Sequence, residues 1–129
     1  TPLKNSSALQ PWNENLENYF RYETVSVAEG GKSRIQPENI QEELENLAQT
    51  DIQECYAQIN SPVLILRATW GRLGNDDLVL PREASQKMLQ TISQAEVVDI
   101  PDSNHYTIIF HPSRERDRAI SSFLGDSKP

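Results

Sequence analysis

The residues of this sequence best suited to chemistry lie in its second half. His105 follows an apolar segment, and Asp77 stands in a turn-rich stretch four residues before Pro81. An imidazole with a pKa of about 6.5 can accept a proton from a nucleophile and return it to a leaving group at neutral pH. A carboxylate beside the ring orients it and stabilises the imidazolium that forms. We therefore take His105 as a candidate general base and Asp77 as its candidate acid partner.

Other aspartates compete for the role of the acid. Asp76 is the obvious rival of Asp77, and either of them also suits a simple turn. Asp99 and Asp102 are nearer to His105 in the sequence. However, Asp99 belongs to a predicted strand and Asp102 to the turn that leaves it.

Two further motifs give weaker indications of a functional site. His111 lies six residues after His105, so the two do not share a helix face, and no cysteine or carboxylate completes a recognisable metal-ligand set. A surface or capping role is enough to explain His111. The segment Gly30-Gly31-Lys32-Ser33 invites a phosphate-loop interpretation, but Ser26 occupies the position of the required first glycine. That segment predicts a Gly-Gly turn, and we expect neither a metal nor another cofactor.

The second half of the chain predicts the elements that position these residues. The continuous apolar run Val63–Leu66 is typical of a strand buried on both faces, and Glu96–Ile100 is typical of a second strand. A helix that begins at Pro81 stands between them, and apolar residues within 119–124 mark a closing helix. The order strand, loop, helix, strand, loop, helix is that of a parallel sheet with helices over its faces.

The first half of the chain is helical and acidic. Thr24–Val27 predicts a short extended piece, and Pro37 suits a first helical position. Three apolar stripes at helical spacing are Trp12, Leu16, Tyr19 and Phe20; Ile40, Leu44, Leu47 and Ala48; and Ile52, Cys55, Tyr56 and Ile59. Cys55 is expected to be a small buried residue.

Composition restricts the classes of partner. The 129 residues carry a formal net charge of −7, and no Lys or Arg lies between Gln36 and Leu66. Such an acidic surface repels the negatively charged phosphate backbone, so nucleic-acid binding is disfavoured. The single cysteine excludes an internal disulfide. No apolar stretch approaches membrane-spanning length and no signal peptide is visible, so we expect a cytoplasmic protein that does not bind membranes.

The ordered set Pro62–Ala68, Asp77, Ala95–Pro101 and Asn104–Tyr106 resembles the last third of the α/β-hydrolase fold. In that family an acid follows one late strand, and the histidine lies in the loop after the next. The resemblance covers residues 60–125 and, more loosely, 10–59. It implies an α/β fold in which residues 1–59 are a helical cap-like segment. Residues 60–129 are then the C-terminal β-α-β-α part of the hydrolase core.

The resemblance also implies a function. The complete protein would hydrolyse a small-molecule ester, thioester or similar bond through a triad of a nucleophile, His105 and Asp77. No Gly-x-Ser-x-Gly elbow occurs in the sequence. The nucleophile and the oxyanion-hole amides would therefore belong to the N-terminal half of the fold, which this chain lacks. We expect the chain to be inactive alone. The aromatic residues Trp12, Tyr19, Phe20 and Tyr22 are candidates for pocket lining or, more simply, for core packing.

One departure from the family pattern puts the acid in doubt. The family usually has its carboxylate two or three residues after the strand tip, where this chain has Thr69-Trp70-Gly71. Asp77 keeps the expected spacing to Pro81 and His105, as though a short insertion preceded it.

Two alternatives stay open. In one, the triad has decayed and Trp70 marks the lost acid. In the other, the chain is an independent acidic α/β module that acts in protein–protein interaction. A two-stranded parallel sheet is marginal in water, so a lone chain is expected to need the missing half, to self-associate or to rearrange its helices.

Overall fold

The computed structural model describes residues 2–74 and 76–125. Within these ranges it is a mixed α/β structure with six α-helices and two small sheets. The helices are α1 (Glu14–Glu23), α2 (Pro37–Gln49), α3 (Ile52–Tyr56), α4 (Arg82–Thr91), α5 (Thr107–Phe110) and α6 (Arg114–Leu124). The strands are β1 (Thr24–Val27), β2 (Gly30–Ser33), β3 (Val63–Ala68) and β4 (Ala95–Ile100), and two short 3₁₀ helices, η1 (Pro2–Asn5) and η2 (Ser7–Leu9), precede α1.

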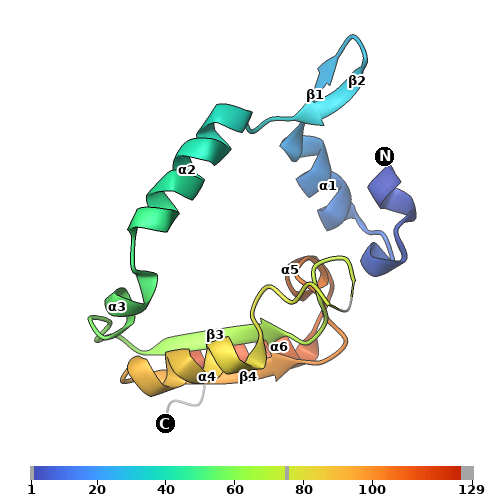
Figure 1. Ribbon diagram of the computed structural model, residues 1–129. Coiled ribbons are helices and arrows are strands. Elements are labelled where there is room, and N and C mark those ends of the chain that lie inside the picture. The colour runs from blue at the N-terminus through green and yellow to red at the C-terminus, as the bar shows by residue number, and fades with distance from the viewer. Residues whose placement is uncertain (1, 75, 126–129) are drawn as a thin grey trace.

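Strands β3 and β4 pair in parallel, as the sequence predicts. The register runs from Val63 opposite Ala95 to Ala68 opposite Ile100. Helix α4 connects the two strands and packs on β4, while α6 packs on both strands. Figure 1 shows α4 in front of this sheet and α6 behind it, so the pair forms the middle of three layers. The predicted order β-α-β-α is therefore confirmed, with the short helix α5 as an addition before α6.

The burial of β3 on both faces is only partly realised. Ile65 is buried, whereas Val63, Leu64 and Leu66 are half-buried. The Val63 amide donates to the Gln94 carbonyl at an N–O distance of 2.9 Å. In a parallel strand, every second residue directs its backbone N–H and C=O groups to the same neighbouring strand. Val63 bonds toward β4, so the backbone groups of Leu64 and Leu66 point to the opposite edge. No strand of the described residues pairs there.

Helix α1 leads into an antiparallel hairpin of β1 and β2. Thr24 stands opposite Ser33 and Val27 opposite Gly30. The predicted Gly-Gly turn is wrong in its position, because residues 28–29 form the turn and the two glycines lie in β2. Gly30 has a φ of +124°, which a residue with a side chain rarely adopts, and this explains a glycine directly after the turn.

Helices α2 and α3 form one side of an open arch that leads from the hairpin back to β3 (Figure 1). Pro37 is the first residue of α2, as predicted. Every residue of α2 is exposed, and Cys55 on α3 is exposed rather than buried, since no described element packs extensively on this arm. None of the helices in the described ranges has the length and apolar character that a membrane crossing needs.

The N-terminal segment packs against the C-terminal half of the chain. Leu9 and Leu16 have no exposed surface, and they are among the few fully buried side chains. Asn13 caps α1 by accepting from the Leu16 amide at 2.9 Å, and its Nδ2 donates to the Phe110 carbonyl of α5, also at 2.9 Å. Part of the predicted cap-like segment is thus attached to the β-α-β-α part by specific contacts.

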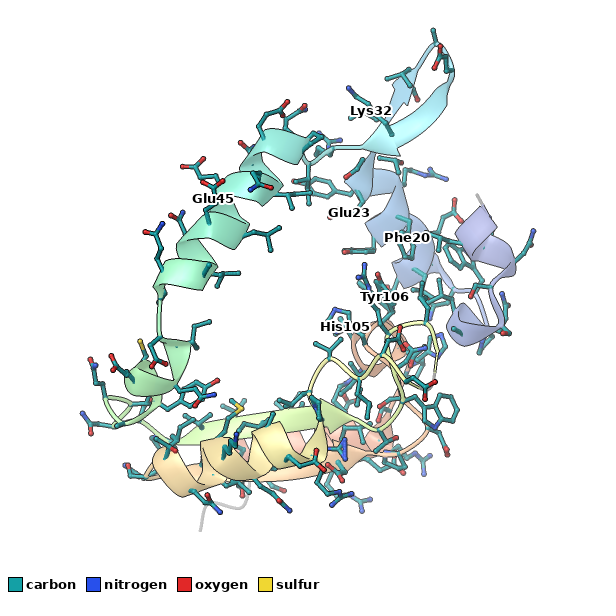
Figure 2. The ribbon with its side chains drawn as sticks, in the orientation of Figure 1. Phe20, Glu23, Lys32, Glu45, His105 and Tyr106 are labelled. Atoms are coloured by element: carbon teal, nitrogen blue, oxygen red, sulfur yellow. The ribbon has the colours of Figure 1, made fainter. Side chains whose placement is uncertain are left out.

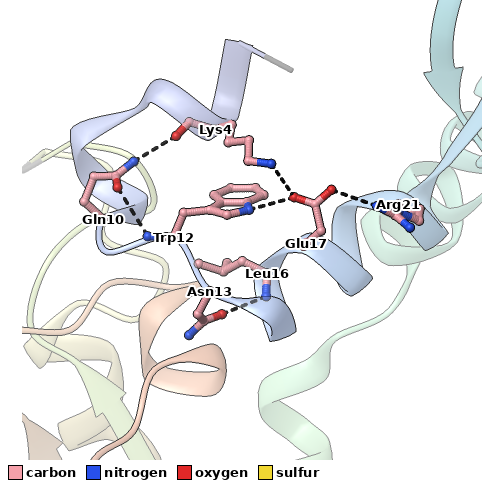
Figure 3. A network of polar contacts seen from close by, with 7 residues as sticks. All are labelled: Lys4, Gln10, Trp12, Asn13, Leu16, Glu17 and Arg21. Carbon is pink, nitrogen blue, oxygen red and sulfur yellow. Dashed lines mark hydrogen bonds and ion pairs between the residues drawn. The ribbon is translucent and has the colours of Figure 1, made fainter.

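A carboxylate network stabilises this segment. Glu17 accepts from Lys4 Nζ and from Trp12 Nε1, each at 2.8 Å, and from Arg21 at 3.1 Å (Figure 3). The hydrogen bond from Lys4, followed by those from Trp12 and Arg21, lowers the pKa of Glu17 from its usual 4.5 to about 2. The ionised form of Glu17 therefore stabilises the native state.

Replacing Glu17 by Gln should reduce the acid sensitivity of the fold. Above pH 4.5 Glu17 is ionised in both states and its contribution is complete. As the pH falls from 4.5 to about 2, the unfolded chain binds a proton that the native chain does not, and the contribution is lost. Thermal melts across this range should show a shallower decline for Glu17→Gln than for the wild type. The control is Glu42→Gln on exposed α2, and equal slopes for all three proteins would refute the assignment.

Candidate functional site around His105

His105 lies where the two parallel strands end. The loop that carries it follows β4 and precedes α5, and the loop after β3 lies beside it, because parallel strands bring their carboxyl ends to one edge. The imidazole is exposed and meets the ring of Tyr106 edge to face at 5.4 Å between centroids. Figure 2 shows both rings on the inner side of the arch. This is the location that the sequence predicts for the histidine.

The pocket beside His105 is small. Its volume is about 110 Å³, and its lining consists of Leu66, Ala68, Trp70, Val79, Leu80 and His105. Pockets for small organic ligands usually measure about 300–1,000 Å³. The pocket is therefore lined mainly by apolar side chains and is smaller than the usual site for a small organic ligand.

Asn104 fixes the loop that carries His105. Its side chain is 3% exposed, and its Oδ1 accepts from the amides of Tyr106 at 3.0 Å and Thr107 at 2.9 Å. Its Nδ2 donates to the carbonyl of Ala8 at 2.6 Å. Asn104 thus joins the first turn of α5 to the N-terminal segment. Sequence reasoning missed this role, although an Asn shortly before an apolar helical run is a known capping signal.

Asp77 closes its own loop. Its carboxylate accepts from the amides of Leu73 and Gly74, each at 3.0 Å, and its carbonyl accepts from the Arg72 amide, also at 3.0 Å. The Leu73 amide, followed by that of Gly74, lowers the pKa of Asp77. No hydrogen bond joins Asp77 to His105 in the described part of the chain. The structure therefore places both residues in neighbouring loops without a hydrogen bond between their side chains.

The rival acids have different surroundings. Asp99 on β4 accepts from Arg67 Nε of β3 at 2.9 Å and from Arg82 of α4 at 3.2 Å, so two arginines match its charge. Asp102 has a left-handed φ of 54° in the turn after β4 and is exposed. Asp76 is exposed beside Asp77. Asp76 therefore stays the obvious rival of Asp77 for the acid role.

His111 occupies the end of α5. It is the C-cap residue of that helix, and its carbonyl accepts from Arg116 Nη1 at 2.8 Å. The same nitrogen also donates to the carbonyls of Ile108 at 2.9 Å and Ile109 at 3.1 Å. The Nε2 atom of His111 is buried and has no hydrogen-bond partner among the described residues. These contacts agree with the capping role expected of His111.

Three of the four predicted aromatic residues pack near the site. Trp12 stacks on Phe20 at 5.7 Å between centroids, Phe20 lies 5.7 Å from Tyr106, and Tyr19 lies 4.8 Å from Phe110. The rings thus form one cluster that joins α1 to α5 and supports Tyr106. Tyr22 is different, because it is 68% exposed and stacks under Arg34 instead.

Asn104 offers a test of how the loop is held. Asn104→Asp keeps the acceptor for the Tyr106 and Thr107 amides but sets an oxygen against the Ala8 carbonyl. It should therefore release the N-terminal segment while α5 persists. Asn104→Ala removes both functions and should cost about 1–3 kcal/mol for each buried group left without a partner. Amide hydrogen exchange distinguishes the two variants. Asn104→Asp should raise exchange only before residue 10, whereas Asn104→Ala should raise it at α5 as well. The control is Asn15→Asp, whose exposed bond to Phe110 is long, at 3.4 Å. Protection of the N-terminal segment in Asn104→Asp would contradict the assignment.

Comparisons with known proteins add no family: no family model matches the chain, and neither a curated protein nor a solved structure matches it. The functional argument therefore depends on the geometry around His105.

Proposed function

We propose that this chain is the C-terminal part of an α/β-hydrolase that cleaves a small ester-like substrate. His105 is the general base of this reaction and Asp77 its acid partner. The nucleophile comes from a complementary segment of the fold. The observation that carries the proposal is the position of His105, at the carboxyl ends of a parallel strand pair. No described strand pairs with the outer edge of β3 in this pair.

The surroundings of Asp77 are compatible with its role. A carboxylate has about four lone-pair sites, and the Leu73 and Gly74 amides use two of them. These bonds orient the group and keep it ionised, and they leave acceptor capacity for an imidazole N–H.

The complementary segment has a definite task. It supplies a strand for the free edge of β3, where Leu64 and Leu66 direct their backbone groups. The carboxyl end of that strand then reaches the same sheet edge as His105, where loops of a parallel sheet converge. A nucleophile and oxyanion-hole amides in those loops would enlarge the small pocket into a site for a substrate acyl group.

The first expected result is that the purified chain alone hydrolyses no chromogenic ester. The chain contains no nucleophile elbow, so His105 has nothing to activate. The measurement is turnover of a short-chain nitrophenyl ester. Turnover by the lone chain that disappears in His105→Ala would show that the nucleophile lies within these residues, and the two-part proposal would be wrong.

The second test uses the chain together with the polypeptide encoded immediately upstream of it. In an active assembly His105→Ala should lower kcat by several orders of magnitude, because triad members act as a unit. Asp77→Asn should lower it less, and His111→Ala least. A fluorophosphonate probe should label the upstream polypeptide, not this chain. If Asp77→Asn leaves the rate unchanged, Asp76→Asn is the matched alternative. An assembly that is active and indifferent to His105→Ala would sink the proposal.

A second candidate function is protein–protein interaction without catalysis. The observation that favours it is the apolar face of α2, which no described element covers. Sedimentation and thermal melting of the lone chain separate the two candidates. A folded monomer with a sharp transition favours the independent module, whereas self-association or a broad transition favours the incomplete sheet.

A further inference from the structure

Hydrogen bonds join the loop after β3 to the loop after β4. The Arg72 Nε atom donates to the Tyr106 hydroxyl oxygen at 3.3 Å. The Trp70 amide donates to the Ser103 carbonyl at 2.8 Å, so the two segments stay in contact beyond the ends of their strands. Tyr106 directly follows His105 in the chain. The contact between Arg72 and Tyr106 therefore lies beside the candidate base.

Arg72 also belongs to the closed loop that Asp77 forms. Its amide donates to the Asp77 carbonyl at 3.0 Å, while the Asp77 carboxylate accepts from the amides of Leu73 and Gly74. Gly71 is buried, and a Cβ atom at this position would overlap the Asp77 carboxylate and the Gly74 carbonyl. Because this loop is compact, a displacement of Arg72 also displaces the carboxylate of Asp77.

Tyr106 is fixed from the other side. Its amide donates to Asn104 Oδ1 at 3.0 Å. Its half-buried ring lies 5.7 Å from the ring of Phe20 on α1, and the ring of His105 meets it edge to face (Figure 2). The Tyr106 hydroxyl is therefore an acceptor for Arg72 whose position is tied to the loop of His105.

Electrostatics favours the same arrangement. The hydrogen bond with Tyr106 raises the pKa of Arg72, and the charge of the Asp77 carboxylate adds a smaller increase. The charged guanidinium of Arg72 thus interacts with a group from each of the two loops. Its rigid, planar geometry also suits a bridge between two fixed partners.

We propose that the Arg72–Tyr106 pair is a clasp that sets the position of the Asp77 loop relative to the His105 loop. Arg72 and Tyr106 are then positioning residues, because they act through Asp77 and His105. The clasp itself is a property of the lone chain, whereas its part in catalysis rests on the proposed function. Asn104 joins the His105 loop to the N-terminal segment, and the clasp joins the same loop to the candidate acid.

The first experiment measures the clasp in the full chain, without any hydrolysis. Tyr106→Phe removes the acceptor oxygen and keeps the ring, while Arg72→Met removes the donors and keeps a side chain of similar length. Either change should raise the hydrogen-exchange rate of the Trp70 amide about two- to tenfold, because the loops then separate more often. The double variant should exchange no faster than either single variant, since both remove the same bond.

Tyr22→Phe is the matched control, because Tyr22 also contacts an arginine, Arg34, but its ring is exposed at the end of α1. It should leave the exchange rate of the Trp70 amide unchanged. Protection of the Ile65 amide in β3 reports that each variant is folded. An unchanged Trp70 exchange rate in both single variants, or additive effects in the double variant, would overturn the clasp.

The second experiment uses the assembly with the upstream polypeptide. Tyr106→Phe and Arg72→Met should lower kcat about two- to tenfold and leave KM unchanged, because the clasp orients the acid and the base rather than the substrate. Arg72→Lys should recover part of the kcat that Arg72→Met loses, since it keeps a donor for Tyr106. An unchanged kcat in Tyr106→Phe, in an assembly that His105→Ala inactivates, would refute the positioning role alone. Activity that does not depend on His105 would refute the proposed function and the positioning role with it, while the exchange rates of the lone chain still decide whether the clasp exists.

Discussion

Parallel pairing of β3 with β4 brings the loops after both strands to one edge of the sheet, and everything of chemical interest in this chain follows from that geometry. The pairing also imposes a requirement, because parallel strands need cover on both faces and partners on their edges. Helices α4 and α6 cover the two faces of β4. Strand β3 is covered less completely, and three of the four residues Val63–Leu66 are only half-buried. The same pairing that positions His105 therefore leaves an edge that a further strand would satisfy.

The loop of His105 is held by contacts with distant segments of the chain. Asn104 and the aromatic cluster connect it to η2 and α1. Arg116 donates hydrogen bonds to three carbonyls at the end of α5. The imidazole of His105 itself is exposed, and the pocket beside it is apolar but small.

Much of the fold could be predicted from the sequence because its signals are local. The apolar run of β3, Pro37 at the start of α2 and the stripe of α1 each indicate their own element, and all three are confirmed. The turn before β2 was misplaced, since Gly30 is required by its positive φ after the turn rather than within it. Cys55 was misjudged because a helical stripe predicts which face is apolar, but not whether another element covers it.

The candidate site was less predictable, for a related reason. The place of His105 follows from strand order, which the sequence contains. The contacts of Asn104 with Ala8 and of Asn13 with Phe110 join distant segments, and no local pattern encodes them. The relation of Asp77 to His105 stays a prediction, since the carboxylate is bound by its own loop.

The long separation between Ala8 and Asn104 has a consequence for the order of folding. The two residues are 96 positions apart, so a ribosome must deliver all the residues between them before the segment around Ala8 finds its binding surface. Strands β3 and β4 with α4 and α6 are contiguous and close shorter loops, so they are expected to form earlier. The N-terminal segment is then the last piece to dock during synthesis. By the same logic it is the first to detach, as a separate unit of local opening, when the native protein fluctuates.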